Sequence, residues 1–133
     1  MSIMTVQLRS VANTQAAMGS ANGHAIMIDR PKGTAGGLGL GFNGGQLLAL
    51  AIGGCFCNDL HAIAHETGVR LTSLAIDVAV TFDGNPLIAT HAVMKAAATA
   101  DHGDAAAVIA RAREISAVSN SLRRGVPVEI VGR

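Results

Sequence analysis

The sequence predicts one α+β domain, residues 1–133, in which a long apolar helix packs on a mostly antiparallel sheet. Residues 43–68 are the only stretch that is long and apolar enough to form the core element. Pairs of strand-like segments, each pair joined by turn residues, come before and after this stretch. Half of the 133 residues are apolar, which is enough for a folded core in a chain of this length. The expected order of elements is β-β-α-β-β-α-β.

The long helix has a start signal, a stop signal and an apolar middle. Asn43 can accept hydrogen bonds from the free N–H groups of the first turn, and Gly68 is the residue type that closes helices in the left-handed conformation. From residue 46 to residue 57 nearly every side chain is apolar, so this half is expected to be covered on all sides. The apolar run ends at Asn58, well short of the roughly 20 residues that cross a bilayer. We therefore expect a long buried central helix in a soluble protein, with no membrane partner.

Alternation and turn chemistry predict two β-hairpins. Residues 2–11 alternate, GSANG at residues 19–23 has the composition of a hairpin turn, and residues 24–29 form the return strand. Residues 69–82 and 87–98 alternate on either side of the turn sequence Asp-Gly-Asn-Pro and form a second, longer hairpin.

Three further segments complete the chain. Residues 33–45 hold seven glycines and are expected to be an irregular loop that leads into the long helix, because the glycine spacing matches no nucleotide-binding fingerprint. A second, amphipathic helix opens at Asp101 or Gly103 and runs to about Leu122. Residues 126–131 are predicted to form a last short strand.

Composition and cysteine spacing exclude some functions and locations. Ten basic and nine acidic residues leave a formal charge of +1, and Trp and Tyr are absent, so nucleic acid is not an expected partner. Cys55 and Cys57 point about 200° apart around one helix, which is too divergent for a mutual disulfide. They are expected to be thiols in a reducing compartment. The first ten residues show no signal-peptide pattern, so the predicted location is cytoplasmic.

The order of these motifs resembles the osmotically inducible protein C and organic hydroperoxide resistance family, written OsmC/Ohr. The resemblance covers most of the chain and includes the long helix with a cysteine in its middle, GGQLLALAIGGCF. Cys55 followed by Phe56 lies where the family has Cys-Phe. SAVSNSL at residues 116–122 resembles the family's second-cysteine motif, Cys-Pro-hydrophobic-Ser-x-x-Leu. The resemblance implies a homodimer of intertwined subunits with active sites at the subunit interface.

The resemblance also implies thiol peroxidase chemistry at Cys55. In the family's characterised enzymes one cysteine attacks an organic hydroperoxide and a second cysteine resolves the sulfenic acid. An arginine and a glutamate activate the first thiol. Here Gly45 occupies the glutamate position, Ser116 occupies the position of the resolving cysteine, and residues 18–23 contain no arginine.

The implied function is that of a hydroperoxide reductase in oxidative stress defence that lacks the second cysteine. Ser116 cannot resolve a sulfenic acid, so the reductant is Cys57 after rearrangement, a cysteine of another subunit, or an external thiol. Arg9 and Arg30 are candidates for the missing cation. The competing hypothesis is a non-catalytic dimer that binds an apolar small molecule at the subunit interface, with Cys55 as an inert hydrophobic residue.

Cys57, His61 and His65 form a second constellation that does not depend on the family. Their i, i+4, i+8 spacing places them on one stripe of the helix. Two histidines at this spacing with a thiolate one turn earlier can bind zinc, and a thiol beside an imidazole can act as a nucleophile. A partly exposed polar stripe is the third interpretation. Asp59, on the same helix, is expected to be solvated, and the predicted function includes no metal and no cofactor.

Overall fold

The computed structural model describes residues 1–132, and the chain divides into two units, Met1–Leu48 and a second unit that begins at Ala49. Both units contain antiparallel strands, and the helices belong to the second unit apart from the first residues of the longest one. The predicted α+β class with antiparallel sheets is confirmed.

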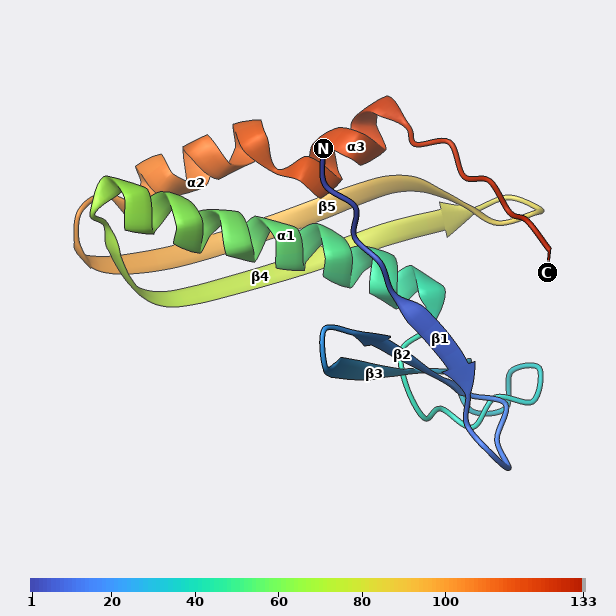
Figure 1. The fold of residues 1–133 in the computed structure, drawn as a ribbon. Coiled ribbons are helices and arrows are strands. Elements are labelled where there is room, and N and C mark those ends of the chain that lie inside the picture. The colour runs from blue at the N-terminus through green and yellow to red at the C-terminus, as the bar shows by residue number, and fades with distance from the viewer. Residues whose placement is uncertain (133) are drawn as a thin grey trace. The chain divides into compact units, whose positions relative to one another are not determined.

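Three antiparallel strands form the sheet of the first unit, in the order β1-β2-β3 (Figure 1). They are β1 (Gln7–Ser10), β2 (Ala17–Ala21) and β3 (His24–Ile28). Asn22 and Gly23 join β2 to β3, and both have positive φ, 51° and 81°. Two-residue hairpin turns need positive φ at these positions to match the twist of their strands. The predicted return strand is therefore confirmed as β3.

The presence of β2 corrects the prediction of a simple hairpin. A strand occupies part of the segment in which a turn was expected, residues 19–23, and the first strand begins at Gln7 instead of Ser2. Gly19 lies buried in the middle of β2, and a Cβ atom there would come 3.1 Å from Cδ1 of Ile28. A glycine that makes room for a neighbouring side chain has the same signature in the sequence as a turn glycine.

The glycine-rich loop after β3 is irregular, as predicted, and is organised by Asp29. The buried Asp29 carboxylate accepts hydrogen bonds from the backbone N–H groups of Arg30 (2.8 Å), Leu38 (3.0 Å) and Leu40 (3.1 Å). The hydrogen bond from the Leu40 N–H is the largest cause that lowers the pKa of Asp29, and the N–H groups of Leu38 and Arg30 lower it further. Desolvation of the buried carboxylate raises the pKa but does not cancel these hydrogen bonds. A charged carboxylate thus holds the two arms of the loop together.

The long helix α1 (Gly44–Thr67) has the bounds that its end signals predict. The Gln46 N–H donates to Oδ1 of Asn43 (2.9 Å), and the Asn43 N–H donates back to Oε1 of Gln46 (3.0 Å). This reciprocal pair satisfies N–H groups that have no partner inside the helix. Gly68 follows the last turn with φ of 71°, the left-handed conformation that glycine adopts at little cost.

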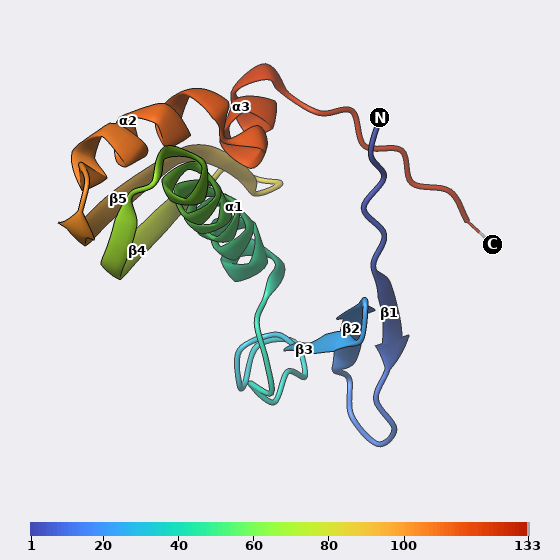
Figure 2. The same ribbon diagram turned by 60° about the vertical axis from the view of Figure 1, so that its left-hand side comes forward.

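The second unit pairs a long antiparallel hairpin with helices on one of its faces (Figures 1 and 2). The hairpin confirms the second predicted strand pair. Besides the residues of α1 from Ala49 onward, its elements are β4 (Arg70–Asp83), β5 (Ile88–His102), α2 (Ala105–Ile115) and α3 (Ala117–Arg124).

The core of the second unit lies between the helices and the inner face of the hairpin. Large side chains on β4 are paired with alanines on β5, as in Leu74 opposite Ala98 and Ile76 opposite Ala96. This pairing leaves the helices room to pack closely. The buried core cluster consists of Phe56, Leu60, Ile63 and Ala64 of α1 with Val108 and Ala112 of α2.

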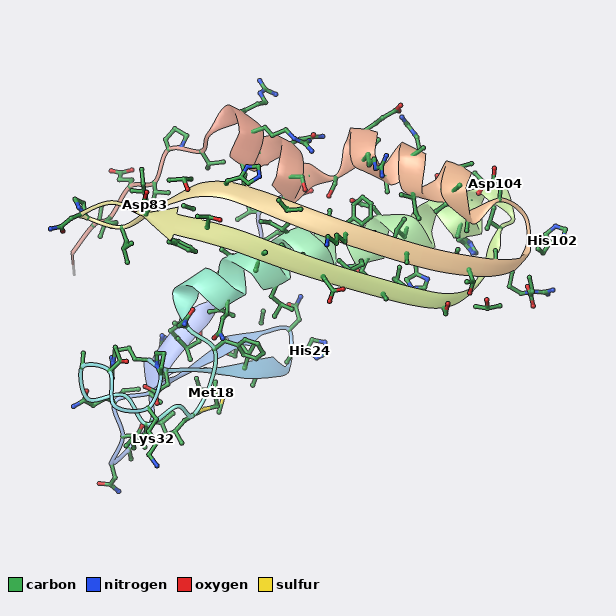
Figure 3. The ribbon with its side chains drawn as sticks, turned by 180° about the vertical axis from the view of Figure 1, so that it is seen from behind. Met18, His24, Lys32, Asp83, His102 and Asp104 are labelled. Atoms are coloured by element: carbon green, nitrogen blue, oxygen red, sulfur yellow. The ribbon has the colours of Figure 1, made fainter. Side chains whose placement is uncertain are left out.

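The second predicted helix is two helices. β5 continues to His102, so α2 starts later than Asp101 or Gly103, after Asp104 (Figure 3). The backbone of Ser116 leaves the helical conformation (φ −60°, ψ 111°) and separates α2 from α3. The sequence contains no Pro or Gly at this point, and for that reason one continuous helix was expected.

The last predicted strand, residues 126–131, pairs with no other strand in the described part of the chain. Its apolar side chains face solvent, with Val128 82% and Ile130 92% exposed. A segment forms a β-strand only when it exchanges backbone hydrogen bonds with a neighbouring strand. The alternating pattern of residues 126–131 was therefore not sufficient to form a strand in this chain.

α1 buries one face within the chain and leaves Leu50 half exposed. The expected coverage on all sides is therefore not reached by a single chain. Within residues 1–132, α1 is the one helix that is long and apolar enough to cross a membrane by length and composition alone. Core helices of soluble proteins have the same character, and the buried face of α1 packs against α2 and the hairpin.

Candidate functional site

Cys55 lies in the middle of α1, at the border of the buried face. Its neighbours Ile52 and Phe56 are 5% and 2% exposed and belong to the packed side of the helix. Cys55 itself is half-buried and is a free thiol. The thiol therefore lies next to the buried Phe56 and keeps part of its surface exposed in this chain.

Among residues 1–132, Cys55 makes one polar side-chain contact, with Asp59 one turn later on α1. Its Sγ donates to Oδ2 of Asp59 at 3.9 Å, within the range for a hydrogen bond to a large sulfur atom. The spacing i, i+4 places the two side chains on the same face of the helix. Both residues are half-buried, so the expectation that Asp59 is solvated is corrected.

Cys57 is half-buried and is also a free thiol. In the described residues, no hydrogen bond joins its side chain to His61, and both His61 and His65 are exposed. Residues 1–132 contain no group of three or more His, Cys, Asp and Glu side chains that is arranged to hold a metal ion. The Cys57, His61 and His65 stripe is therefore not assembled as a zinc site.

Ser116, at the expected position of a resolving cysteine, lies at the junction of α2 and α3. It is 1% exposed, and its Oγ has no hydrogen-bond partner within residues 1–132. Its backbone makes hydrogen bonds to both helices. The Ser116 N–H donates to the carbonyl of Ala112 in α2 (3.0 Å), and the Ser116 carbonyl accepts from the N–H of Asn120 in α3 (3.0 Å). Ser116 is a buried structural junction with one unsatisfied hydroxyl.

The two candidate arginines belong to the first unit. Arg30 donates to Oε1 of Gln15 (3.0 Å) and pairs with Asp29 at 3.6 Å. Arg9 is exposed and donates to the carbonyl of Leu8. Both side chains therefore contact residues of the first unit.

The sequence predicts Cys55 as a candidate site residue, and the structure adds its contact with Asp59. The signal was present, because a carboxylate four residues after a cysteine on one helix is a neighbour in space. The distance between Asp59 and Glu66 along the helix is too great for an acid–base pair, which favours a solvated Asp59 when the sequence is considered alone.

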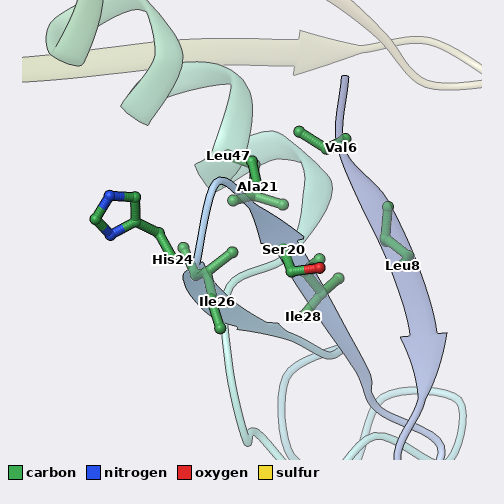
Figure 4. Close-up of a pocket in the computed structure, with 10 residues that line it drawn as sticks. Val6, Leu8, Ser20, Ala21, His24, Ile26, Ile28 and Leu47 are labelled. Carbon is green, nitrogen blue, oxygen red and sulfur yellow. The ribbon is translucent and has the colours of Figure 1, made fainter. Parts of the chain in front are cut away.

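The first unit contains an apolar pocket of about 340 Å³ (Figure 4). It opens between the three strands and the first turn of α1, and almost all of its lining surface is apolar. This volume lies at the lower end of the range for small-molecule sites, roughly 300–1,000 Å³. Prominent among the lining residues are Val6, Leu8, Ala21, Ile26, Ile28 and Leu47.

A family model described as OsmC-like protein matches residues 36–131 of this chain. The matched range includes most of the glycine-rich loop, α1, the long hairpin and both following helices. No curated protein matches the sequence.

Solved structures with the same fold cover nearly the whole chain. An OsmC-like protein of unknown function from Vibrio cholerae has a TM-score of 0.76 at 12% identity, covering 91% of this chain and 94% of its own. An organic hydroperoxide resistance protein from Legionella pneumophila has a TM-score of 0.62 at 18% identity, covering 92% and 90%. The organic hydroperoxide resistance protein OhrB of Bacillus subtilis has a TM-score of 0.59 at 18% identity, covering 91% and 90%.

Proposed function

This chain belongs to the OsmC-like protein family, and we propose that it reduces organic hydroperoxides through the thiol of Cys55, in defence against oxidative stress. The observation that carries the proposal is the place of Cys55, a free and accessible thiol held in the middle of α1 by the buried Phe56. The relatives from Legionella pneumophila and Bacillus subtilis, which are named for organic hydroperoxide resistance, support the substrate class.

The first half of the proposed reaction oxidises Cys55. The sulfur attacks the terminal oxygen of the hydroperoxide, the S–O bond forms as the O–O bond breaks, and the alkoxide leaves and takes a proton to become the alcohol. Two electrons pass from sulfur to the peroxide. The product on the protein is a sulfenic acid.

The second half returns Cys55 to the thiol. Ser116 has a hydroxyl where a resolving thiol would be needed, so we assign the reduction to an external thiol. That thiol condenses with the sulfenic acid, releases water and forms a mixed disulfide, and a second thiol then displaces Cys55. Cys57 projects about 200° away on the same helix and can replace the external thiol only after the helix rearranges.

A homodimer is part of the proposal, because one chain leaves apolar surface uncovered. Leu50 of α1 is 50% exposed, and residues 126–131 have a strand pattern but no paired edge within residues 1–132. Exposed apolar surface of this kind marks interaction sites. Light scattering should give twice the 13.5 kDa mass of one chain, and a monomer would contradict the assignment. The two free thiols fit a cytoplasmic location.

Trapping of the sulfenic acid tests the function. Protein mixed with a small molar excess of cumene hydroperoxide and dimedone should gain one dimedone adduct in its intact mass. The adduct should be absent in Cys55→Ser and present in Cys57→Ser. Absence of an adduct in the unmodified protein after minutes of exposure would overturn the proposal.

Binding of an apolar small molecule is the second candidate function, and the 340 Å³ pocket favours it. Native mass spectrometry with decanol as the probe should show one bound molecule per chain. Ala21→Phe should abolish binding by filling the pocket, whereas Cys55→Ser should bind decanol as the unmodified chain does. Equal binding by the Ala21→Phe variant would rule out this pocket as the site.

A further inference from the structure

We propose that Asp59 is a catalytic residue that takes the proton of the Cys55 thiol during attack on the hydroperoxide and returns it to the leaving alkoxide. The inference rests on the proposed function of Cys55 and adds Asp59, which the sequence alone predicts to be solvated. Its basis is the direct contact between the reacting sulfur and the carboxylate, with Sγ and Oδ2 separated by 3.9 Å.

The protein holds both partners of this contact in place. Cys55 precedes Phe56, and Asp59 precedes Leu60; the two hydrophobic residues are 2% and 0% exposed and belong to the same core cluster. The half-buried pair therefore projects from a helix face whose orientation is set by packing. A proton donor and acceptor within one helical turn need no loop movement to meet.

The surroundings leave Asp59 without a competing cation. In residues 1–132 the ion pairs join other groups, Arg30 to Asp29, Arg70 to Asp101 and Arg111 to Glu114. The core cluster around the buried face of α1 also includes hydrophobic side chains of β4, β5 and α2. On α1 itself, the positions one turn from Asp59 are occupied by Cys55, Phe56, Ala62 and Ile63. The thiol is thus the hydrogen-bond partner that the fold provides for this carboxylate.

The proposed step balances with these two groups alone. Oδ2 of Asp59 accepts the S–H proton as sulfur bonds to the terminal peroxide oxygen. The O–O bond breaks, and the departing alkoxide recovers the same proton from Asp59. The sum is one thiol and one hydroperoxide converted into one sulfenic acid and one alcohol, with Asp59 regenerated as the carboxylate.

The opposite role for Asp59 would be repression. A fixed negative charge next to sulfur opposes a second negative charge, so a carboxylate that did not take part in proton transfer would slow the reaction. The two roles predict opposite signs for Asp59→Asn, which removes both the charge and the base while keeping the size of the side chain.

The rate of sulfenic acid formation distinguishes them. The rates of dimedone adduct formation with cumene hydroperoxide at pH 7 are compared among variants that all carry Cys57→Ser. In these variants Cys55 is the one thiol that can form the adduct. Asp59→Asn should slow the reaction about 100-fold, the lower end of typical general acid–base contributions. Asp59→Glu should recover part of the rate. The matched control Glu66→Gln, which removes an exposed carboxylate from the same helix, should not change it.

An equal or faster rate in Asp59→Asn would overturn the inference and leave the proposed function in place. A Cys57→Ser protein that forms no adduct would overturn the proposed function, and alkylation of Cys55 by iodoacetamide then measures the Asp59 effect without any peroxide. Slower alkylation in Asp59→Asn supports proton transfer to Asp59, and faster alkylation supports repression. Equal thermal unfolding of the Asp59 variants shows that the fold is retained.

Discussion

Gly53 of α1 lies directly against Val78 of β4: a Cβ atom at Gly53 would come 3.0 Å from Cγ2 of Val78 and 3.3 Å from Cγ2 of Ile76. The helix that carries Cys55 therefore approaches the hairpin so closely that a methyl group at Gly53 would press on the side chains of Val78 and Ile76. In this contact the segment of α1 that carries Cys55 lies close to the hairpin.

Replacement of Gly53 by leucine should destabilise the second unit, because the added side chain must displace Val78 or move the helix. Overpacking of this kind costs about 1–3 kcal/mol. The free energy of unfolding in urea measures the loss. Gly54→Ala is the matched control, since a Cβ there has no neighbour within 4 Å in the chain and alanine favours a helix by about 0.5–1 kcal/mol. A stable Gly53→Leu protein would show that α1 can shift freely.

Asp29 should make stability depend on acid pH. Hydrogen bonds from Leu40, Leu38 and Arg30 lower the pKa of Asp29 below its ordinary value of 3.8. A lowered pKa means that the stabilising contribution is complete above the unfolded-state value and is lost as the pH falls through the lower folded-state value.

The unfolding free energies of the unmodified protein and of Asp29→Asn should therefore differ at pH 7 and converge below pH 3.8. Urea unfolding at a series of pH values measures the difference. Glu129→Gln, which changes an exposed carboxylate, should show no such convergence. A difference that does not vary with pH would mean that the loop is not held by the charge of Asp29.

Asp104 should contribute to the stability of α2 through its cap. Its Oδ1 accepts from the N–H groups of Ala106 (2.9 Å) and Ala107 (3.3 Å). Asp104→Ala should cost about 1 kcal/mol, the usual effect of losing such a cap, whereas Asp104→Asn should lose much less because asparagine caps nearly as well. Thermal unfolding of the two variants distinguishes them, and equal losses would point to charge instead of capping.

Ser116→Ala should keep or slightly raise the stability of the protein. The Ser116 hydroxyl is buried without a hydrogen-bond partner in the described residues, and removing an unsatisfied group removes its desolvation cost, about 1–3 kcal/mol. Peroxide-dependent dimedone labelling of Cys55 should not change. A clear loss of stability would show that the hydroxyl has a partner when the protein is assembled.

The sequence predicted the elements whose signals are local. Asn43 and Gly68 marked the ends of α1, and alternation with a turn marked the β4–β5 hairpin. Cys55 is a candidate from the sequence because the motif around it is contiguous. Asp59 was within reach of the same reasoning, since its contact with Cys55 needs only the four-residue spacing of a helix.

Other features depended on partners that are distant along the chain. In the sequence Gly19 resembles a turn residue. The structure shows that it lies within β2 and leaves space for the side chain of Ile28, so the sequence did not predict this strand. Ser116 interrupts a helix without Gly or Pro. Residues 126–131 have a strand's alternation but no paired edge in the described chain.

The sequence by itself determined that this is an α+β chain with a cysteine in the middle of a long apolar helix, because helix caps, alternation and i, i+4 neighbours act over a few residues. Only the tertiary structure decided which side of that helix is buried, that Gly53 meets β4, and that Cys55 stays accessible beside Asp59. Burial and strand pairing depend on contacts between segments that are far apart in the sequence. A local sequence pattern carries no information about how such segments pack together.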